Sequence, residues 1–122
     1  MDFSNLFRHE TDTVDFAAGD TIIRHGEVGD FMYVLIEGEA EIRLGEQVVG
    51  AVGPGALLGE LALIDRTPGS ADVLARKACR LVRIDERRFR FLVQQTPNFA
   101  LDVMKVIVER LRAMNARAGQ SL

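Results

Sequence analysis

The stretch 54–73 combines backbone and side-chain groups that could hold an anion beside a hydroxyl-bearing group. Its first part is glycine-rich, and Gly59 is followed directly by the carboxylate of Glu60 and by the helix-like residues Leu61 and Ala62. Backbone amides at a glycine-led helix start can hold a phosphate. A single carboxylate beside such an anion needs a donor, and a sugar hydroxyl would supply one. The pattern therefore indicates a ligand with a phosphate and a ribose, although a tight turn with a surface glutamate would explain the same residues.

Other side chains that carry chemistry are isolated in this sequence. His9 and His25 have no neighbours at the spacing of a metal site, and no Ser/His/Asp or Cys/His set accompanies them. Cys79 is the single cysteine, so it cannot form an internal disulfide, and its alternating apolar neighbours favour a thiol in the core. We therefore expect neither an enzyme, nor a metal site, nor a bound cofactor.

Composition and charge limit the class of protein. The chain has 122 residues, 48% of them hydrophobic and 27% charged, which is typical of one globular domain. The net charge of −3 gives no electrostatic support for direct nucleic-acid binding. The sequence has no apolar run long enough to span a membrane, and its first residues do not resemble a signal peptide. We expect a cytoplasmic protein without membrane contact.

Short strands separated by glycine turns are predicted for most of the chain. After a short amphipathic helix over 1–9, with Asp2 or Ser4 as its N-cap, the roll extends from about 12 to 85. Ten of the eleven glycines lie between residues 19 and 69. The predicted strands are 21–23, 31–36, 40–44, 47–52, 71–75 and 79–84. Such strands with regular turns indicate a β-sandwich or barrel.

Two helices are predicted after the strands. Asp85 can cap the first, whose basic run Arg87, Arg88 and Arg90 is interpreted as a solvated face rather than a binding patch. Pro97 starts the second, predicted over 97–116.

The second helix carries more apolar surface than one core contact needs. One stripe holds Leu101, Met104, Val108 and Leu111, and a second holds Phe99, Val103, Val106, Ile107 and Met114. The two stripes together span about 200° of the helix, whereas a helix that buries one face needs an arc of about 100°. We expect one stripe to pack on the roll and the other to form a homodimer, with complete burial inside a monomer as the alternative.

These patterns together resemble the cyclic nucleotide-binding domain of cAMP- and cGMP-controlled kinases, channels and bacterial transcription regulators. The matching residues run through almost the whole chain: Phe16, Gly19, Ile22, Gly26, Gly29, Met32 to Leu35, Gly38 and Ala40, then 52–64, Thr67, Pro68, Ser70, Ala71 and Val73. The resemblance implies one domain over 1–122 with an eight-stranded jelly roll and flanking helices. It also implies a regulatory function in signal transduction, with cAMP or cGMP as the ligand.

The resemblance assigns roles to residues that match the family's phosphate-binding cassette. Gly59 is similar to the glycine that approaches the ligand, and Glu60 to the acid that accepts a hydrogen bond from the ribose 2′-hydroxyl. Leu61 and Ala62 resemble the helix start whose amides face the phosphate. Ser70 and Ala71 resemble the small residues beside the phosphate.

One position departs from the family's pattern. Gly69 stands where the family places the arginine that clamps the cyclic phosphate, and Arg66 is the nearest cation that could reach the same group. Two functions therefore remain open. The domain either binds a cyclic nucleotide or a related ligand and signals through its last helix, or it keeps the fold without the nucleotide and serves as a dimerisation or protein-interaction module.

Overall fold

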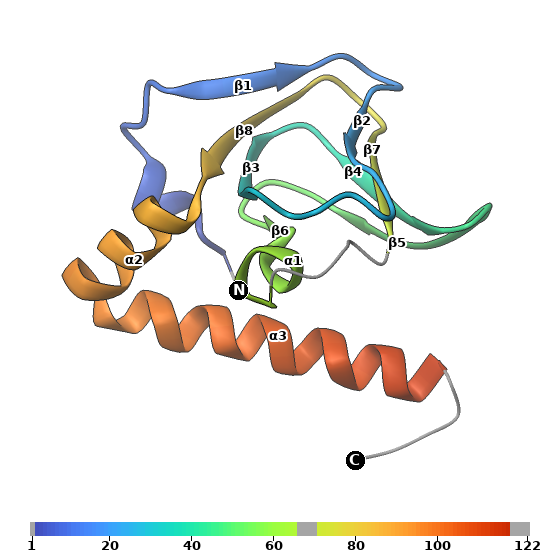
Figure 1. The fold of residues 1–122 in the computed structure, drawn as a ribbon. Helices are drawn as coiled ribbons and strands as arrows, with labels where there is room; N and C mark the ends of the chain where they lie inside the picture. The colour runs from blue at the N-terminus through green and yellow to red at the C-terminus, as the bar shows by residue number, and fades with distance from the viewer. Residues whose placement is uncertain (1, 66–70, 118–122) are drawn as a thin grey trace. The chain divides into compact units, whose positions relative to one another are not determined.

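The computed structural model describes residues 2–65 and 71–117 and divides the chain into two compact units, Met1–Glu86 and Arg87–Leu122 (Figure 1). The first unit holds the strands and the second holds most of the helical residues. Residues 66–70 lie outside the described residues, and they include the positions Arg66, Gly69 and Ser70 of the predicted site.

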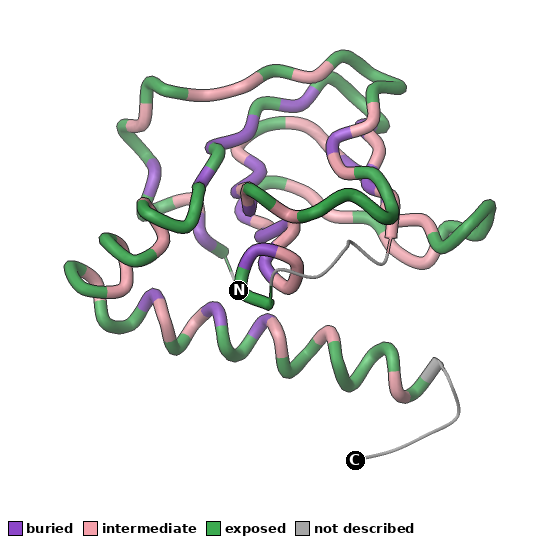
Figure 2. Tube along the Cα trace, viewed as in Figure 1, coloured by how far each residue is buried: buried purple, intermediate pink, exposed green. Residues whose placement is uncertain are grey.

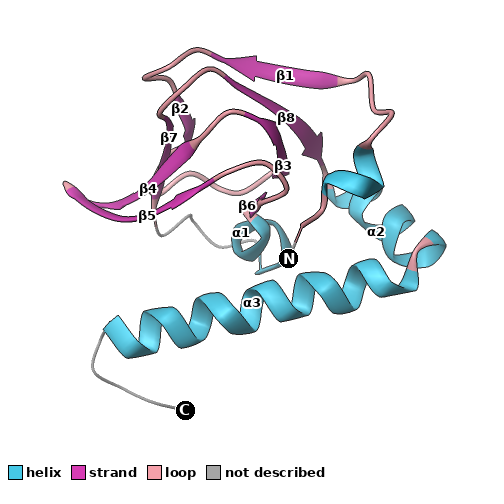
Figure 3. Cartoon of the chain, turned by 180° about the vertical axis from the view of Figure 1, so that it is seen from behind, coloured by secondary structure: helices cyan, strands magenta, loops and turns pink. Residues whose placement is uncertain are grey.

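The described part of the first unit forms two antiparallel sheets, shown as magenta strands in Figure 3. The strands are β1 (Thr13–Phe16), β2 (Thr21–Ile23), β3 (Met32–Glu37), β4 (Ala40–Leu44), β5 (Gln47–Val52), β6 (Leu57–Leu58), β7 (Asp72–Ala75) and β8 (Cys79–Ile84). One sheet has the order β1-β8-β3-β6 and the other β2-β7-β4-β5. This arrangement confirms the expected β-rich roll and the strands that the alternation of apolar residues predicted.

The two sheets meet in an apolar core, visible as the buried segments of Figure 2. Its fully buried members include Leu35 of β3 and Leu81 of β8, and Val73 of β7 faces them from the other sheet. Cys79 belongs to this core, as its neighbours predicted. Burial raises the pKa of the Cys79 thiol, which favours its neutral form.

The N-terminal helix is shorter than expected. A 3₁₀ helix covers Ser4–Phe7, and Phe3 and Phe7 are buried while Leu6 stays 38% exposed. The Asp2 carboxylate accepts a hydrogen bond from the Ser4 amide, two residues along the chain, at 2.7 Å. The Phe3 amide donates to the Gly55 carbonyl at 2.8 Å, so the segment is fixed to the turn before β6.

An ion-pair cluster covers the outer face of β4. Arg76 donates to Glu39 at 2.8 Å and to Glu41 at 3.1 Å, and Glu41 also accepts from Arg43. The hydrogen bond from Arg76 lowers the pKa of Glu39, and those from Arg43 and Arg76 lower the pKa of Glu41, in both cases below the ordinary value of 4.5. The folded state therefore favours the ionised form of both carboxylates.

This cluster predicts that the roll loses stability in acid. A carboxylate with a lowered pKa stabilises the fold above about pH 4.5, and that contribution disappears as the pH falls through the lowered value. We expect Arg76→Gln to reduce the difference in the free energy of unfolding between neutral pH and about pH 3, measured by urea denaturation. Arg24→Gln is the control, because Arg24 and Glu27 form an exposed pair at 3.6 Å. An unchanged pH dependence in Arg76→Gln would contradict the assignment.

The second unit contains α2 (Glu86–Gln95), whose first residue closes the first unit, and α3 (Pro97–Arg117). As predicted, α2 begins directly after Asp85, and α3 begins at Pro97 and ends one residue beyond its predicted end. The rings of Phe89 and Phe99 pack edge to face with their centroids 5.8 Å apart, which joins the two helices.

The two predicted stripes of α3 differ in burial. Phe99, Val103 and Val106 are buried, whereas the other stripe is open to solvent. Its exposed fractions are 51% for Leu101, 58% for Met104, 44% for Val108 and 41% for Leu111. Met114, which the sequence placed on the same stripe as Phe99, is also exposed, at 43%. The single chain therefore leaves one continuous apolar stripe uncovered.

Candidate functional site

The candidate site begins where β6 ends and the short helix α1 (Glu60–Asp65) starts. Gly59 connects them with φ +77, in the left-handed region that favours glycine. A Cβ at Gly59 would lie 3.1 Å from both Ile23 Cδ1 and the Phe31 carbonyl oxygen, which is closer than such contacts normally are. This turn is therefore restricted to glycine by its backbone conformation and by its neighbours.

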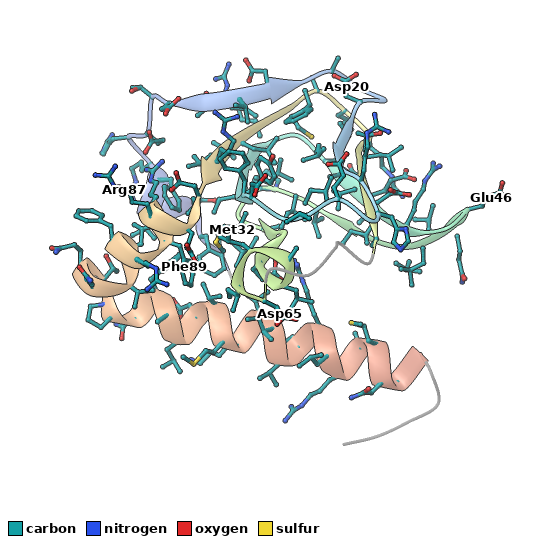
Figure 4. The ribbon with its side chains drawn as sticks, in the orientation of Figure 1. Asp20, Met32, Glu46, Asp65, Arg87 and Phe89 are labelled. Carbon is teal, nitrogen blue, oxygen red and sulfur yellow. The ribbon has the colours of Figure 1, made fainter. Side chains whose placement is uncertain are left out.

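Glu60 is the first residue of α1, and none of it is exposed to solvent. The turn at Gly59 directs the chain inward, next to Met32 of β3, which is also fully buried and is labelled in Figure 4. A carboxylate in such a place is costly unless polar groups compensate for its lost hydration. The sequence alternative of a surface glutamate in a tight turn is therefore wrong.

The strand before the site is fixed by pairing with β3. Leu57 and Leu58 of β6 are both buried and lie opposite Val34 and Tyr33. The Leu35 amide donates to the Ala56 carbonyl at 2.9 Å. These contacts hold the backbone that enters Gly59, so the position of Glu60 is set by the sheet rather than by a free loop.

The connection between β2 and β3 contacts the chain on both sides of residues 66–70. On the α1 side, Gly29 packs so closely that a Cβ there would overlap the Ala62 side chain. On the β7 side, the His25 amide donates to the Asp72 carboxylate at 2.7 Å. This connection therefore orders the two described flanks of the candidate site.

The described residues of the predicted site lie in two places, at the start of α1 and directly before β7. Gly59, Glu60, Leu61 and Ala62 form a single turn at the start of α1, with Leu61 and Ala62 partly exposed. Ala71 is also partly exposed and directly precedes β7 in the second sheet. The ligand roles of all these residues, and those of Ser70, Arg66 and Gly69, stay predictions.

Sequence reasoning missed a cluster of rings and one cation beside β6. The guanidinium of Arg83 lies 4.6 Å from the centroid of the Phe31 ring, and the rings of Phe31 and Tyr33 are 6.4 Å apart. Burial raises the pKa of Tyr33. The alternation of Phe31 and Tyr33 could have placed both rings on one face, but Arg83 belongs to β8 and is brought there only by the sheet pairing with Tyr33.

A metal site and a membrane-spanning helix have no support in the part of the chain that the structure describes. It contains no cluster of three or more His, Cys, Asp or Glu side chains that could hold a metal ion. Of the helices in residues 2–65 and 71–117, none is both long enough and apolar enough to cross a membrane.

Comparison with known proteins identifies relatives of the chain. The family model "Cyclic nucleotide-binding domain" matches residues 13–96. The chain is 29% identical over 107 residues to the "CRP-like cAMP-activated global transcriptional regulator" of Mycobacterium tuberculosis, a match that covers 84% of this chain and 48% of the relative. The chain thus spans about half the length of this curated relative.

Solved structures with the same architecture include the Catabolite Activator Protein of Thermus thermophilus. That protein is 22% identical with a TM-score of 0.79, over 93% of this chain and 61% of the other, which shows a shared fold. A structure described as "Sp-2Cl-cAMPS bound to PKAR CBD2" is 27% identical with a TM-score of 0.73, over 91% of this chain and 73% of the other.

Proposed function

Because the chain belongs to the cyclic nucleotide-binding domain family, we propose that it is a regulatory sensor domain that binds cAMP, cGMP or a related ligand in its β-roll. The observation that carries this proposal is Glu60, a fully buried carboxylate at the start of α1. A ribose hydroxyl that donates to Glu60 would offset part of the cost of burying its charge.

The remaining contacts of the proposed site come from the backbone and from small side chains. The amides of Gly59, Leu61 and Ala62 would face the ligand's phosphate, with Ser70 and Ala71 beside it. The bound "Sp-2Cl-cAMPS" of the related structure supports a cyclic nucleotide as the ligand class. Calorimetric titration with cAMP and cGMP tests the proposal, and absence of both heat and a melting shift at millimolar nucleotide would exclude these two ligands.

Signalling requires that the ligand discriminate between two states of the chain. We propose that binding in the roll changes the position of α3 and that a partner senses this change. A ligand can shift that equilibrium only by the difference between its affinities for the two states. The curated relative is named as a cAMP-activated regulator, which supports a regulatory function here.

Gly69 favours a second candidate function. Without the family's arginine, a buried cyclic phosphate would lose a charge-assisted hydrogen bond that contributes about 1.5–3 kcal/mol. In that alternative, the domain keeps its fold, binds no nucleotide and acts as a dimerisation or protein-interaction module. Glu60 would then have a purely structural role, and replacing it would change stability without changing any nucleotide affinity.

The uncovered stripe of α3 supports a homodimer whether or not the domain binds a nucleotide. Leu101, Met104, Val108 and Leu111 follow one another at spacings of three and four residues, and each is more than 40% exposed. A second copy of α3 offers a matching apolar stripe, as in a two-helix coiled coil.

We expect Leu111→Glu to weaken the dimer about a hundredfold or more, because it places an unpaired carboxylate in an apolar interface. Sedimentation equilibrium measures the change. Glu109→Ala is the matched control, since Glu109 is exposed and lies outside the stripe. A natural chain that stays monomeric at every accessible concentration would contradict the dimer and leave the nucleotide titration unaffected.

A further inference from the structure

A basic and aromatic surface on α2 has no role in the proposed nucleotide site. Arg87, Arg90, Phe91 and Gln94 lie three, four and seven residues apart along the helix, so they share one face. All four are exposed, and 59% of Phe91 is open to solvent. Arg87 is labelled at the start of this helix in Figure 4. We call these four residues the α2 face.

The charge around the α2 face contrasts with that of the rest of the chain. Residues 87–101 contain three arginines and no acidic residue, although the chain as a whole has a net charge of −3. Glu86 is the last acidic residue before this segment. A partner with negative charge would therefore be attracted to α2 and repelled by most of the remaining surface.

The position of Arg87 opposes the stability of its own helix. It lies in the first turn of α2, where the helix carries a partial positive charge that disfavours cations. Among the residues that the structure describes, no carboxylate forms an ion pair with Arg87. An exposed phenylalanine one turn later adds an unfavourable contact with water. Residues that act against local stability without a local compensation point to a contact outside the chain.

We propose that the α2 face docks an acidic protein segment that carries an apolar side chain. A carboxylate of the partner would pair with Arg87, and the partner's apolar side chain would pack on Phe91. Arginine and aromatic residues are the types that contribute most to protein interfaces. A protein segment fits better than nucleic acid, because one helix face in an acidic chain lacks the extended positive field that nucleic-acid binding requires.

A pair of synthetic peptides tests this surface on the full chain. One peptide carries Glu and Leu at helical spacing, and the other has Gln in place of every Glu. We expect the acidic peptide to bind in fluorescence anisotropy, to bind more weakly as salt is added, and to shift amide resonances of residues 87–95. The Gln peptide should bind at least about tenfold more weakly.

Three variants distinguish the α2 face from a general charge effect. Arg87→Glu and Phe91→Ser should each lower the affinity for the acidic peptide about tenfold. Arg112→Glu, which changes an exposed cation on α3 by the same charge, should leave the affinity within about twofold. Melting temperatures no lower than that of the natural chain would show that all three variants are folded.

Four results would overturn the proposal. They are equal binding of the two peptides, no binding of the acidic peptide at millimolar concentration, unchanged affinity in Arg87→Glu, and tighter binding of single-stranded DNA than of the peptide through the same residues. The test is independent of the nucleotide, because the α2 face includes none of the proposed ligand residues.

Discussion

Replacing Glu60 with glutamine is expected to lower the affinity for cAMP or cGMP about ten- to a hundredfold. Glutamine keeps the shape of the buried side chain and removes its charge, so the ribose hydroxyl loses a charge-assisted hydrogen bond. Glu60 is completely buried at the start of α1. Isothermal titration calorimetry measures the affinity of the natural chain and of the variant.

The matched control for this variant is Glu46→Gln. Glu46 is exposed in the turn between β4 and β5 and is labelled in Figure 4, so the same chemical change there should leave the nucleotide affinity unaltered. Equal affinities of the natural chain and Glu60→Gln would show that Glu60 does not contact the ligand. A change in melting temperature without a change in affinity would support a structural role for Glu60.

Gly69→Arg is expected to have the opposite effect and to raise the affinity for the cyclic nucleotide about ten- to a hundredfold. The substitution restores the cation that the family places before the Ser-Ala pair, and the cyclic phosphate gains a charge-assisted partner. Calorimetry with cAMP measures the gain, and added salt should reduce it.

A second arginine variant separates this clamp from a general increase in positive charge. Gly50→Arg changes the net charge equally, at a position on β5 where a side chain meets open space. We expect it to leave the affinity unchanged. If Gly69→Arg gives no gain, the cassette differs from a nucleotide site in more than its arginine, and the interaction-module function is favoured.

Much of the fold could be predicted from local patterns. The strands of the hairpin β4–β5, the strand β8 and both ends of α2 and α3 agree closely with the alternation of apolar residues, the glycine turns and Pro97. These signals are local, because each depends on neighbours within one or two turns of the chain. The separation of the two stripes on α3 also followed from helical periodicity.

Other elements depend on contacts between distant residues, so the local pattern did not reveal them. The strand β6 has two residues and exists because Leu57 and Leu58 pair with β3. The edge strand β1 is defined by its pairing with β8. The N-terminal helix was predicted too long, because only Ser4–Phe7 are helical and the Phe3 amide before them donates to the Gly55 carbonyl of a distant turn.

The candidate site shows the same division. The turn at Gly59 and the importance of Glu60 could be inferred from residue types and from the resemblance to a family. The sequence could not show whether Glu60 faces water or the interior, because the burial of Glu60 depends on how β3 and β6 pair. The contact of Arg83 with Phe31 joins residues far apart in the sequence and has no local signal.

The most direct test of the proposed function is calorimetric titration of the natural chain with cAMP and cGMP, followed by the same titration of Glu60→Gln. We predict saturable heat from the natural chain, with one nucleotide bound per chain, and a much weaker signal from the variant. Ligand binding should also raise the melting temperature of the natural chain. The absence of heat and of any melting shift at millimolar nucleotide, in both the natural chain and Gly69→Arg, would contradict nucleotide sensing by this domain.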